Sequence, residues 1–138
     1  MSNFKISVII PCFNEEETIE KLVTQVLIQD SLIHEIIIVD DKSTDNSREL
    51  IKNIANSNPK IKYFFKDVNE GKGSALIKGF AESTGEIVLI QDADLEYDPQ
   101  EYKKLLKPFI LTNADVVYGS RFLGGDMIRL HFFWHFLA

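Results

Sequence analysis

The sequence predicts a doubly wound α/β fold, in which a mostly parallel sheet carries helices on both faces. Short apolar, β-branched runs alternate along the chain with segments of helical periodicity. Most of these runs are continuous rather than alternating with polar residues, which is typical of strands that are covered on both faces. No repeat or linker interrupts the 138 residues, so we expect a single domain over 1–138.

Five apolar runs are the candidate strands. They are residues 6–10 (ISVII), 36–39 (IIIV), 61–65 (IKYFF), 87–90 (IVLI) and 116–118 (VVY). Pro11 follows the first run and is expected to end that strand, because proline has no N–H to donate to a neighbouring strand. Ligands of such folds bind beyond the carboxyl ends of the strands, so a site is expected in the residues after each run.

The segments between the runs predict helices. Apolar side chains recur at helical spacing over residues 19–27, 50–54 and 75–81. Gly85 is placed to stop the third helix. A fourth helix has the clearest start, with Asp98 at the N-cap, Pro99 at the first helical position and Glu101 two residues later.

The composition excludes several classes of protein. Fifteen Lys+Arg residues against 21 Asp+Glu residues give a net charge of −6, which argues against a nucleic-acid-binding protein. Cys12 is the only cysteine, so the chain has no intramolecular disulfide, and this fits a reducing compartment. No apolar segment reaches the roughly 18–20 residues of a membrane-spanning helix.

Residues 127–138 (MIRLHFFWHFLA) are the most aromatic segment of the chain. On a helix, Ile128, Phe132 and Phe136 would share one face. Because a large exposed apolar face favours association, we expect this segment to contact a second copy of the chain or a membrane surface.

Two adjacent carboxylates, Asp40 and Asp41, follow the second run. Like charges side by side cost free energy unless a partner interacts with them, so both are candidate binding residues. Arg121 follows the fifth run and could pair with a phosphate through two hydrogen bonds. A surface ion pair is the simpler interpretation of an isolated arginine.

Three acidic residues, Asp92, Asp94 and Glu96, follow the fourth run at alternate positions. If the chain stays extended there, their side chains share one face and converge. Such hard oxygen ligands suit Mg²⁺ or Mn²⁺. The competing interpretation is a solvated acidic loop, but a D-x-D directly after an apolar strand favours a metal site.

Two other patterns do not indicate a nucleotide-binding loop or a reactive cysteine. The segment GKGS at residues 71–74 fits neither the phosphate loop G-x-x-x-x-G-K-[ST] nor the dinucleotide fingerprint G-x-G-x-x-G. Lys72 within it remains a candidate for a phosphate contact. Cys12 has no obvious base partner and is interpreted as a residue of a pocket wall.

Together these segments resemble the family 2 glycosyltransferases of the GT-A fold, which have a Rossmann-like nucleotide-binding half. The resemblance rests on VIIPCFNEEETI (8–19), EIIIVDDKSTDNS (35–47), NEGKGSALIKGF (69–80), GEIVLIQDADLEYDP (85–99) and ADVVYGSRF (114–122). QDADLEYDP followed by GSRF is most similar to the dolichol- and polyprenyl-phosphate sugar synthase branch, which implies a lipid-phosphate acceptor.

The resemblance also implies the site residues. The nucleotide-sugar site would contain Pro11, Phe13, Glu15, Val39, Asp40, Asp41, Asp92, Ala93, Asp94 and Arg121. Asp41 would accept hydrogen bonds from the base, and Arg121 would meet a phosphate. Asp92 and Asp94, joined by Glu96, would hold Mg²⁺ or Mn²⁺ against the diphosphate.

The implied function is a metal-dependent, inverting transfer of sugar from a UDP- or GDP-sugar, in the cytoplasm or at the cytoplasmic face of a membrane. Members of the family run further than this chain, so the general base is expected outside the 138 residues. The alternative is a module that binds a nucleotide sugar without its catalytic remainder. A nucleotidyltransferase is disfavoured because no glycine-rich loop follows the first run.

Overall fold

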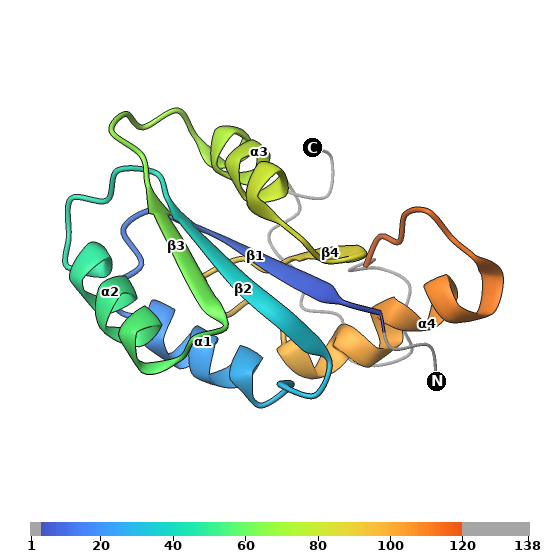
Figure 1. The fold of residues 1–138 in the computed structure, drawn as a ribbon. Coiled ribbons are helices and arrows are strands. Elements are labelled where there is room, and N and C mark those ends of the chain that lie inside the picture. The colour runs from blue at the N-terminus through green and yellow to red at the C-terminus, as the bar shows by residue number, and fades with distance from the viewer. Residues whose placement is uncertain (1–3, 120–138) are drawn as a thin grey trace, which may run out of the picture. The chain divides into compact units, whose positions relative to one another are not determined.

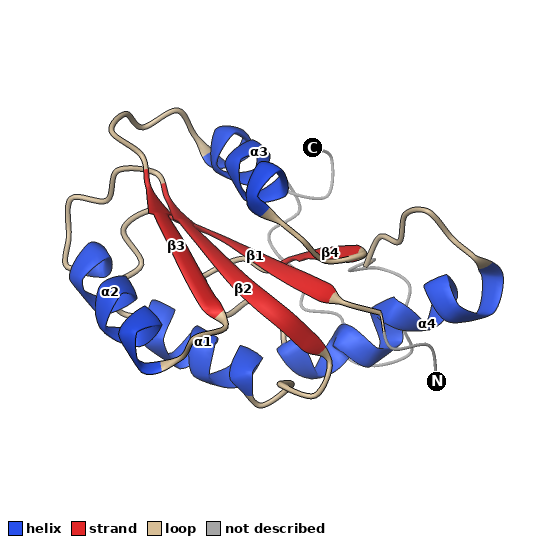
Figure 2. Cartoon of the chain, in the orientation of Figure 1, coloured by secondary structure: helices blue, strands red, loops and turns tan. Residues whose placement is uncertain are grey.

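A four-stranded parallel sheet lies at the centre of the computed structural model, which describes residues 4–119 (Figure 1). Its strands are β1 (Ile6–Cys12), β2 (Ile33–Asp40), β3 (Ile61–Phe65) and β4 (Ile87–Ile90), in the spatial order β3-β2-β1-β4. The helices of this part are α1 (Ile19–Leu27), α2 (Ser47–Ser57) and α3 (Lys72–Glu82). Helices α1 and α2 cover one face and α3 covers the other (Figure 2), which confirms the predicted doubly wound α/β fold.

The chain divides into two compact units, Met1–Glu101 and Tyr102–Ala138. The first contains the sheet and α1 to α3, and it ends in the 3-10 turn Pro99–Glu101. The second begins with helix α4 (Tyr102–Thr112). Among residues 4–119, no helix combines the length and the apolar character needed to cross a bilayer.

The order of the strands locates a crevice at the edge of the sheet. From β1 the chain proceeds outward through β2 to β3, and it then returns to place β4 on the other side of β1. The direction of winding therefore reverses between β1 and β4. In open α/β sheets, such a reversal leaves a crevice at the carboxyl ends of the two strands, where ligands bind.

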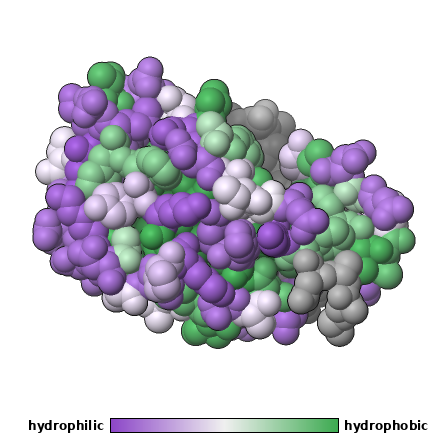
Figure 3. Space-filling view, viewed as in Figure 1, coloured by the Kyte–Doolittle hydropathy of each residue, from purple (hydrophilic) through white to green (hydrophobic). Residues whose placement is uncertain are grey.

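The core is built from the apolar runs that predicted the strands. The side chains of Val8, Ile9 and Ile10 in β1 are fully buried, as are those of Ile36 to Val39 in β2. The predicted stripe on α1 is buried at Ile19, Leu22, Val23 and Val26. Helix α2 buries only Ser47 and Ile51, and its outer side, at the left of the view, is mostly hydrophilic (Figure 3).

Strand β1 does not end at Pro11, contrary to the prediction. It continues to Cys12, and Pro11 lies opposite Val39 of β2. The Ile9 carbonyl accepts the Gln91 N–H at 2.9 Å on the β4 side, whereas the Cys12 carbonyl accepts the Asp41 N–H at 2.8 Å on the β2 side. Because the directions alternate, the missing N–H of Pro11 falls on the side where β4 has already ended, so no strand hydrogen bond is lost.

The prediction that Gly85 stops the third helix is wrong. Gly85 instead allows the chain to approach β1 closely. Helix α3 ends at Glu82, and Ser83 is already extended. A Cβ at Gly85 would lie 2.6 Å from Ser7 Oγ and 2.7 Å from the Lys5 carbonyl oxygen. The Gly85 N–H instead donates to Ser7 Oγ at 2.9 Å. Glycine is required there by packing between segments far apart in the sequence.

The prediction of a fifth strand over residues 116–118 is wrong. These residues are in no strand, and the side chains of Val116 and Tyr118 are 63% and 88% exposed. Three apolar residues are a short run, and a strand is stable only when a neighbour accepts its backbone hydrogen bonds. By contrast, the predicted N-cap is confirmed, since Asp98 Oδ1 accepts the Gln100 N–H at 2.9 Å.

Candidate functional site

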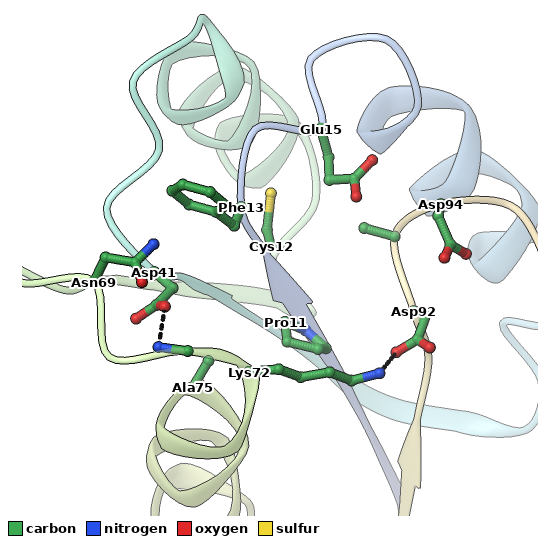
Figure 4. Close-up of a pocket in the computed structure, with 12 residues that line it drawn as sticks. Pro11, Cys12, Phe13, Glu15, Asp41, Asn69, Lys72, Ala75, Asp92 and Asp94 are labelled. Carbon is green, nitrogen blue, oxygen red and sulfur yellow. Dashed lines mark hydrogen bonds and ion pairs between the residues drawn. The ribbon is translucent and has the colours of Figure 1, made fainter. Parts of the chain in front are cut away.

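A pocket of about 340 Å³ lies at the crevice between the carboxyl ends of β1 and β4 (Figure 4). Its walls come from the end of β1, from the segments after β1, β2 and β4, and from the start of α3 and the residues before it. The lining residues are Pro11, Cys12, Phe13, Glu15, Asp41, Asn69, Gly71, Lys72, Ala75, Asp92, Ala93 and Asp94. Seven of the predicted residues therefore share one pocket: Pro11, Phe13, Glu15, Asp41, Asp92, Ala93 and Asp94.

Asp41 forms one end of the pocket and is held as an anion. Its Oδ1 accepts Lys66 Nζ at 2.7 Å and the Glu70 N–H at 3.1 Å, and its Oδ2 accepts the Gly71 N–H at 2.6 Å. Burial alone would raise the pKa of Asp41, but these hydrogen bonds and the charge of Lys66 outweigh it and lower the pKa. The pocket thus contains a fixed carboxylate whose Oδ2 has capacity for a further donor.

Asp40 and Val39, also predicted as site residues, do not line the pocket. The Asp40 side chain is fully buried, where its Oδ1 pairs with Arg48 Nε at 2.5 Å and accepts the Ser43 N–H at 3.1 Å. Val39 packs in the core beside Ile37. The two adjacent carboxylates therefore have separate cations, which removes the repulsion that suggested a shared ligand.

The loop after β1 is held against the loop after β2 by Asn14. This residue has a φ of 54°, which few residues other than glycine and asparagine adopt. Its Oδ1 accepts the Thr44 N–H at 2.8 Å, and its own N–H donates to Ser43 Oγ at 2.9 Å. The N–H of the next residue, Glu15, donates a hydrogen bond to Ser47 Oγ at 2.8 Å. These bonds fix Phe13 and Glu15 in the pocket wall.

The three acidic residues after β4 do not lie on one extended face. The strand ends at Ile90, and the chain then turns, with Leu95 at a φ of 64°. The buried Gln91 closes the turn by donating from Nε2 to the carbonyls of Asp92 and Tyr97, both at 3.1 Å. Asp94 Oδ1 accepts the Glu96 N–H at 3.0 Å. Asp92 and Asp94 line the pocket, whereas Glu96 does not.

The carboxylates of Asp92 and Asp94 fit a divalent cation in chemistry but do not by themselves form a complete ligand set. Within residues 4–119, no group of three or more His, Cys, Asp or Glu side chains is close enough to hold a metal ion. Mg²⁺ commonly keeps several waters and is bound by one or two carboxylates plus phosphate oxygens of the substrate. Two carboxylates on the wall of an open pocket meet that requirement.

Lys72 pairs with Asp92 across the pocket. Lys72 is the first residue of α3, and its Nζ lies 2.5 Å from Asp92 Oδ1. Figure 4 shows the extended lysine side chain passing Pro11 to reach the segment after β4. The sequence left Lys72 as a candidate for a phosphate contact, and the structure places its ammonium group on the pocket wall.

Cys12 lies in the pocket wall, as predicted. Burial, with a further contribution from the negative charge of Asp40, raises the pKa of its thiol to about 12. The sulfur is therefore protonated at neutral pH and is a poor nucleophile. Arg121 and residues 127–138, to which a phosphate contact and an association surface were assigned, lie outside the described residues.

Several residues of the site were missed by the sequence analysis. Asn69 lines the pocket, Lys66 and Arg48 neutralise the two adjacent aspartates, and Gln91 closes the turn that carries Asp92. Lys66 and Arg48 could have been suspected from the two carboxylates, which need cations. Their pairing with one carboxylate each depends on contacts across the loops, so no local pattern gives it.

The model of glycosyl transferase family 2 matches residues 7–132 of the chain. The chain belongs to this family. It is 35% identical over 127 residues to a dolichol-phosphate mannosyltransferase of Pyrococcus furiosus, covering 91% of this chain and 35% of the relative. It is 36% identical over 106 residues to an undecaprenyl-phosphate 4-deoxy-4-formamido-L-arabinose transferase of Yersinia pestis, covering 74% of this chain and 32% of the relative.

Solved glycosyltransferases share the fold of this family 2 chain. A mannosyltransferase of Pyrobaculum calidifontis in complex with GDP-Man and Mn²⁺ has a TM-score of 0.61 and 31% identity, over 66% of this chain and 28% of that one. A glucosyl-3-phosphoglycerate synthase of Mycobacterium tuberculosis with Mn²⁺, UDP and phosphoglyceric acid has a TM-score of 0.65 and 31% identity, over 78% and 39%. The chain spans about a third of the length of the curated relatives it matches.

Proposed function

We propose that the pocket binds a nucleoside-diphosphate sugar together with Mg²⁺ or Mn²⁺, and that residues 1–138 are the nucleotide-sugar-binding domain of an inverting glycosyltransferase. One observation carries the proposal: a single pocket at the winding reversal of the sheet has a fixed anionic acceptor, Asp41, at one end and the carboxylates of Asp92 and Asp94 at the other. A nucleoside diphosphate has base N–H donors at one end and charged phosphates at the other.

The relatives support the class of ligand. The solved mannosyltransferase is in complex with GDP-Man and Mn²⁺, and the solved glucosyl-3-phosphoglycerate synthase is in complex with Mn²⁺ and UDP. Both are 31% identical to this chain, over 66% and 78% of its length. We therefore propose a UDP- or GDP-sugar as the ligand here.

The base is assigned to the end of the pocket near Asp41. The remaining acceptor capacity of Asp41 suits an N–H of uracil or guanine. Phe13 lines the same pocket and is 46% exposed, so its ring can pack on a planar base. The ion pair with Lys66 and the loop contacts of Asn14 hold these groups in place before a ligand binds.

The diphosphate is assigned to the end near Asp92 and Asp94. These two residues would hold the cation, and Glu96 and Arg121 remain proposed contributors. When bound, a divalent cation neutralises the charge that a nucleoside diphosphate develops as a leaving group. Asp92 and Asp94 would orient the phosphates indirectly, by fixing the position of the cation at the pocket wall.

We propose a polyprenyl phosphate as the acceptor, because two relatives are named for transfer to dolichol phosphate and undecaprenyl phosphate. A phosphate acceptor is already anionic, so it can attack the sugar without a general base. Attack from the face opposite the nucleotide inverts the anomeric carbon. A lipid acceptor would bring this domain to a membrane surface at the cytoplasmic face.

A thermal-shift panel tests the ligand class. UDP, GDP, ADP, CDP and their common sugars are added with and without Mn²⁺. A ligand present at about 100 times its Kd stabilises the folded state by about 2.7 kcal/mol. We expect stabilisation by UDP or GDP compounds that needs Mn²⁺. Stabilisation by none of them contradicts the proposal, and binding without sugar transfer to a polyprenyl phosphate supports the module alternative.

Asp94→Asn tests the cation site. Asparagine keeps an oxygen that can accept the Glu96 N–H, so the turn is preserved while the charge is lost. We expect the affinity for nucleoside diphosphate in saturating Mn²⁺ to fall about tenfold or more, measured by calorimetry. Asp67→Asn, an exposed aspartate outside the pocket lining, is the matched control and should leave the affinity unchanged. Equal affinities of the Asp94 variant and the parent would refute the assignment.

A further inference from the structure

The ion pair between Lys72 and Asp92 differs from the other ion pair in the pocket. Asp41 is buried and Lys66 is largely covered, with side-chain exposures of 4% and 14%, and Asp41 accepts two backbone N–H groups as well. The side chains of Lys72 and Asp92 are 55% and 21% exposed. A partly exposed pair is held more weakly than a covered one, because water screens the attraction and the long side chain loses rotational freedom. Lys72 can therefore exchange partners, whereas Lys66 is fixed.

The position of the pair indicates which new partner Lys72 would meet. Lys72 begins α3 on one side of the crevice, and Asp92 follows β4 on the other. The ammonium group thus lies at the Asp92 carboxylate that the proposed cation would contact, and also beside the place of the diphosphate. A lysine cannot keep its Asp92 contact while a divalent cation occupies the same oxygen.

We propose that Lys72 is a place-holding cation: it neutralises Asp92 before ligands bind, yields this carboxylate to a divalent cation, and then pairs with the diphosphate. The inference rests on the proposed nucleotide-sugar function. Ligand binding leaves the net charge of the site unchanged, because the two positive charges of a divalent cation match the two negative charges of a nucleotide-sugar diphosphate. A divalent cation offsets Asp92 and Asp94, and the released ammonium group offsets a charge that remains on the diphosphate.

This assignment gives Lys72 opposite effects on the binding of two ligands. Its removal frees Asp92 for the metal, so Mn²⁺ alone should bind more tightly. The same change removes a positive charge from the phosphates, so nucleoside diphosphate should bind less tightly once Mn²⁺ saturates the site. A residue that only supported the fold would weaken both ligands when replaced.

The test uses the full chain and three variants. Mn²⁺ affinity is measured by electron paramagnetic resonance of the free ion, and UDP and GDP affinities are measured by calorimetry in saturating Mn²⁺. Lys72→Met should bind Mn²⁺ about three- to tenfold more tightly and the preferred diphosphate about three- to tenfold less tightly. Lys72→Arg keeps the charge and should behave like the parent in both measurements.

Lys78→Met is the matched control for the lost charge. Lys78 lies on the same helix, pairs with Glu82, and does not line the pocket. It should change neither affinity. An equal effect of Lys78→Met, or any result in which Lys72→Met does not change the two affinities in opposite directions, overturns the inference. If the parent chain binds neither Mn²⁺ nor any diphosphate, the proposed function itself fails.

Discussion

Asp40 and Asp41 are neighbours in the chain, but their carboxylates meet different partners in the fold. Asp40, the last residue of β2, pairs with Arg48 of α2, and Asp41 pairs with Lys66 at the pocket. The direction of each side chain decides which one can meet a ligand, since successive residues after a strand point to opposite sides. Asp41 is therefore the residue to test for base recognition.

Asp41→Asn should weaken a nucleoside and its diphosphate alike. The amide places an N–H group where Lys66 Nζ or a backbone N–H now donates, which leaves polar groups unpaired. We expect a loss of about 1–3 kcal/mol in the binding of both ligands, and a similar loss in the free energy of unfolding. Calorimetry and urea denaturation measure the two effects.

The control for Asp41→Asn is Asp67→Asn, which makes the same charge change between β3 and α3 at an exposed residue. It should alter neither binding nor unfolding. A loss of affinity confined to the diphosphate would move Asp41 from the base to the phosphates. Unchanged nucleoside affinity in a folded Asp41 variant would contradict base recognition by this carboxylate.

At the scale of elements, the pocket depends on how closely α3 packs on the sheet. Gly79 is buried in α3, and a Cβ there would collide with Ile9 Cγ2 and lie 3.1 Å from Ile9 Cδ1. Ile9 is fully buried in β1, so it has little room to move. The absence of a side chain at Gly79 thus sets the distance between α3 and β1, and with it the position of Lys72 at the start of the helix.

Gly79→Ala should lower the free energy of unfolding by about 1–3 kcal/mol, because the added methyl group overpacks the contact with Ile9. Gly73 provides an internal control in the same helix, since a Cβ there meets nothing within 4 Å. Gly73→Ala should be neutral or stabilise by up to about 1 kcal/mol through higher helix propensity. Urea denaturation of both variants decides the matter. Equal effects would show that helix propensity alone governs the two positions.

At the scale of the whole molecule, Glu35 connects the sheet at its amino edge, opposite the pocket. Its Oε1 accepts Ser7 Oγ at 2.6 Å and the Thr84 N–H at 2.6 Å, and its Oε2 pairs with Lys62 at 2.6 Å. These partners belong to β1, to the connection before β4, and to β3. One carboxylate on β2 thereby links β1, β2 and β3 to the connection that leads into β4.

This network predicts how the stability of the sheet depends on pH. Burial alone would raise the pKa of Glu35, but the hydrogen bonds from Lys62, Ser7 and Thr84 lower it to about 2 from an ordinary value of 4.5. A lowered pKa contributes stability that is complete above pH 4.5 and is lost as the pH falls toward 2. The contribution is about 3 kcal/mol.

Glu35→Gln should lower the free energy of unfolding at pH 7 by about 2–4 kcal/mol, because the amide nitrogen cannot accept the hydrogen bonds that the buried carboxylate accepts from Ser7, Thr84 and Lys62. The variant should also lose less stability than the parent between pH 5 and pH 2, in urea denaturation at a series of pH values. Glu17→Gln, at an exposed residue, should follow the parent curve. Parallel pH profiles of the Glu35 variant and the parent would contradict the role of this carboxylate.

The sequence by itself determined the features that depend on neighbouring residues. Continuous apolar runs predicted β1 to β4, and helical spacing predicted the buried stripe of α1, because strand and helix periods are local properties of the chain. The Asp98 cap was also local, since its acceptor and donor are two residues apart. Motif resemblance predicted Phe13, Asp41 and Asp92 in one site, and all three line the same pocket.

The tertiary structure alone decided the features that depend on contacts between distant segments. Pro11 stays in β1 because β4 ends beside it, and Gly85 is required by Ser7, 78 residues away. The turn closed by Gln91 separates Glu96 from Asp92 and Asp94, which the alternating pattern placed together. The pairing of Lys72 with Asp92 also depends on contact between segments that are distant in the sequence. A charged side chain finds a partner only where the fold brings two elements within a few ångströms of each other. The periodicity of the sequence gives no information on the distance between elements.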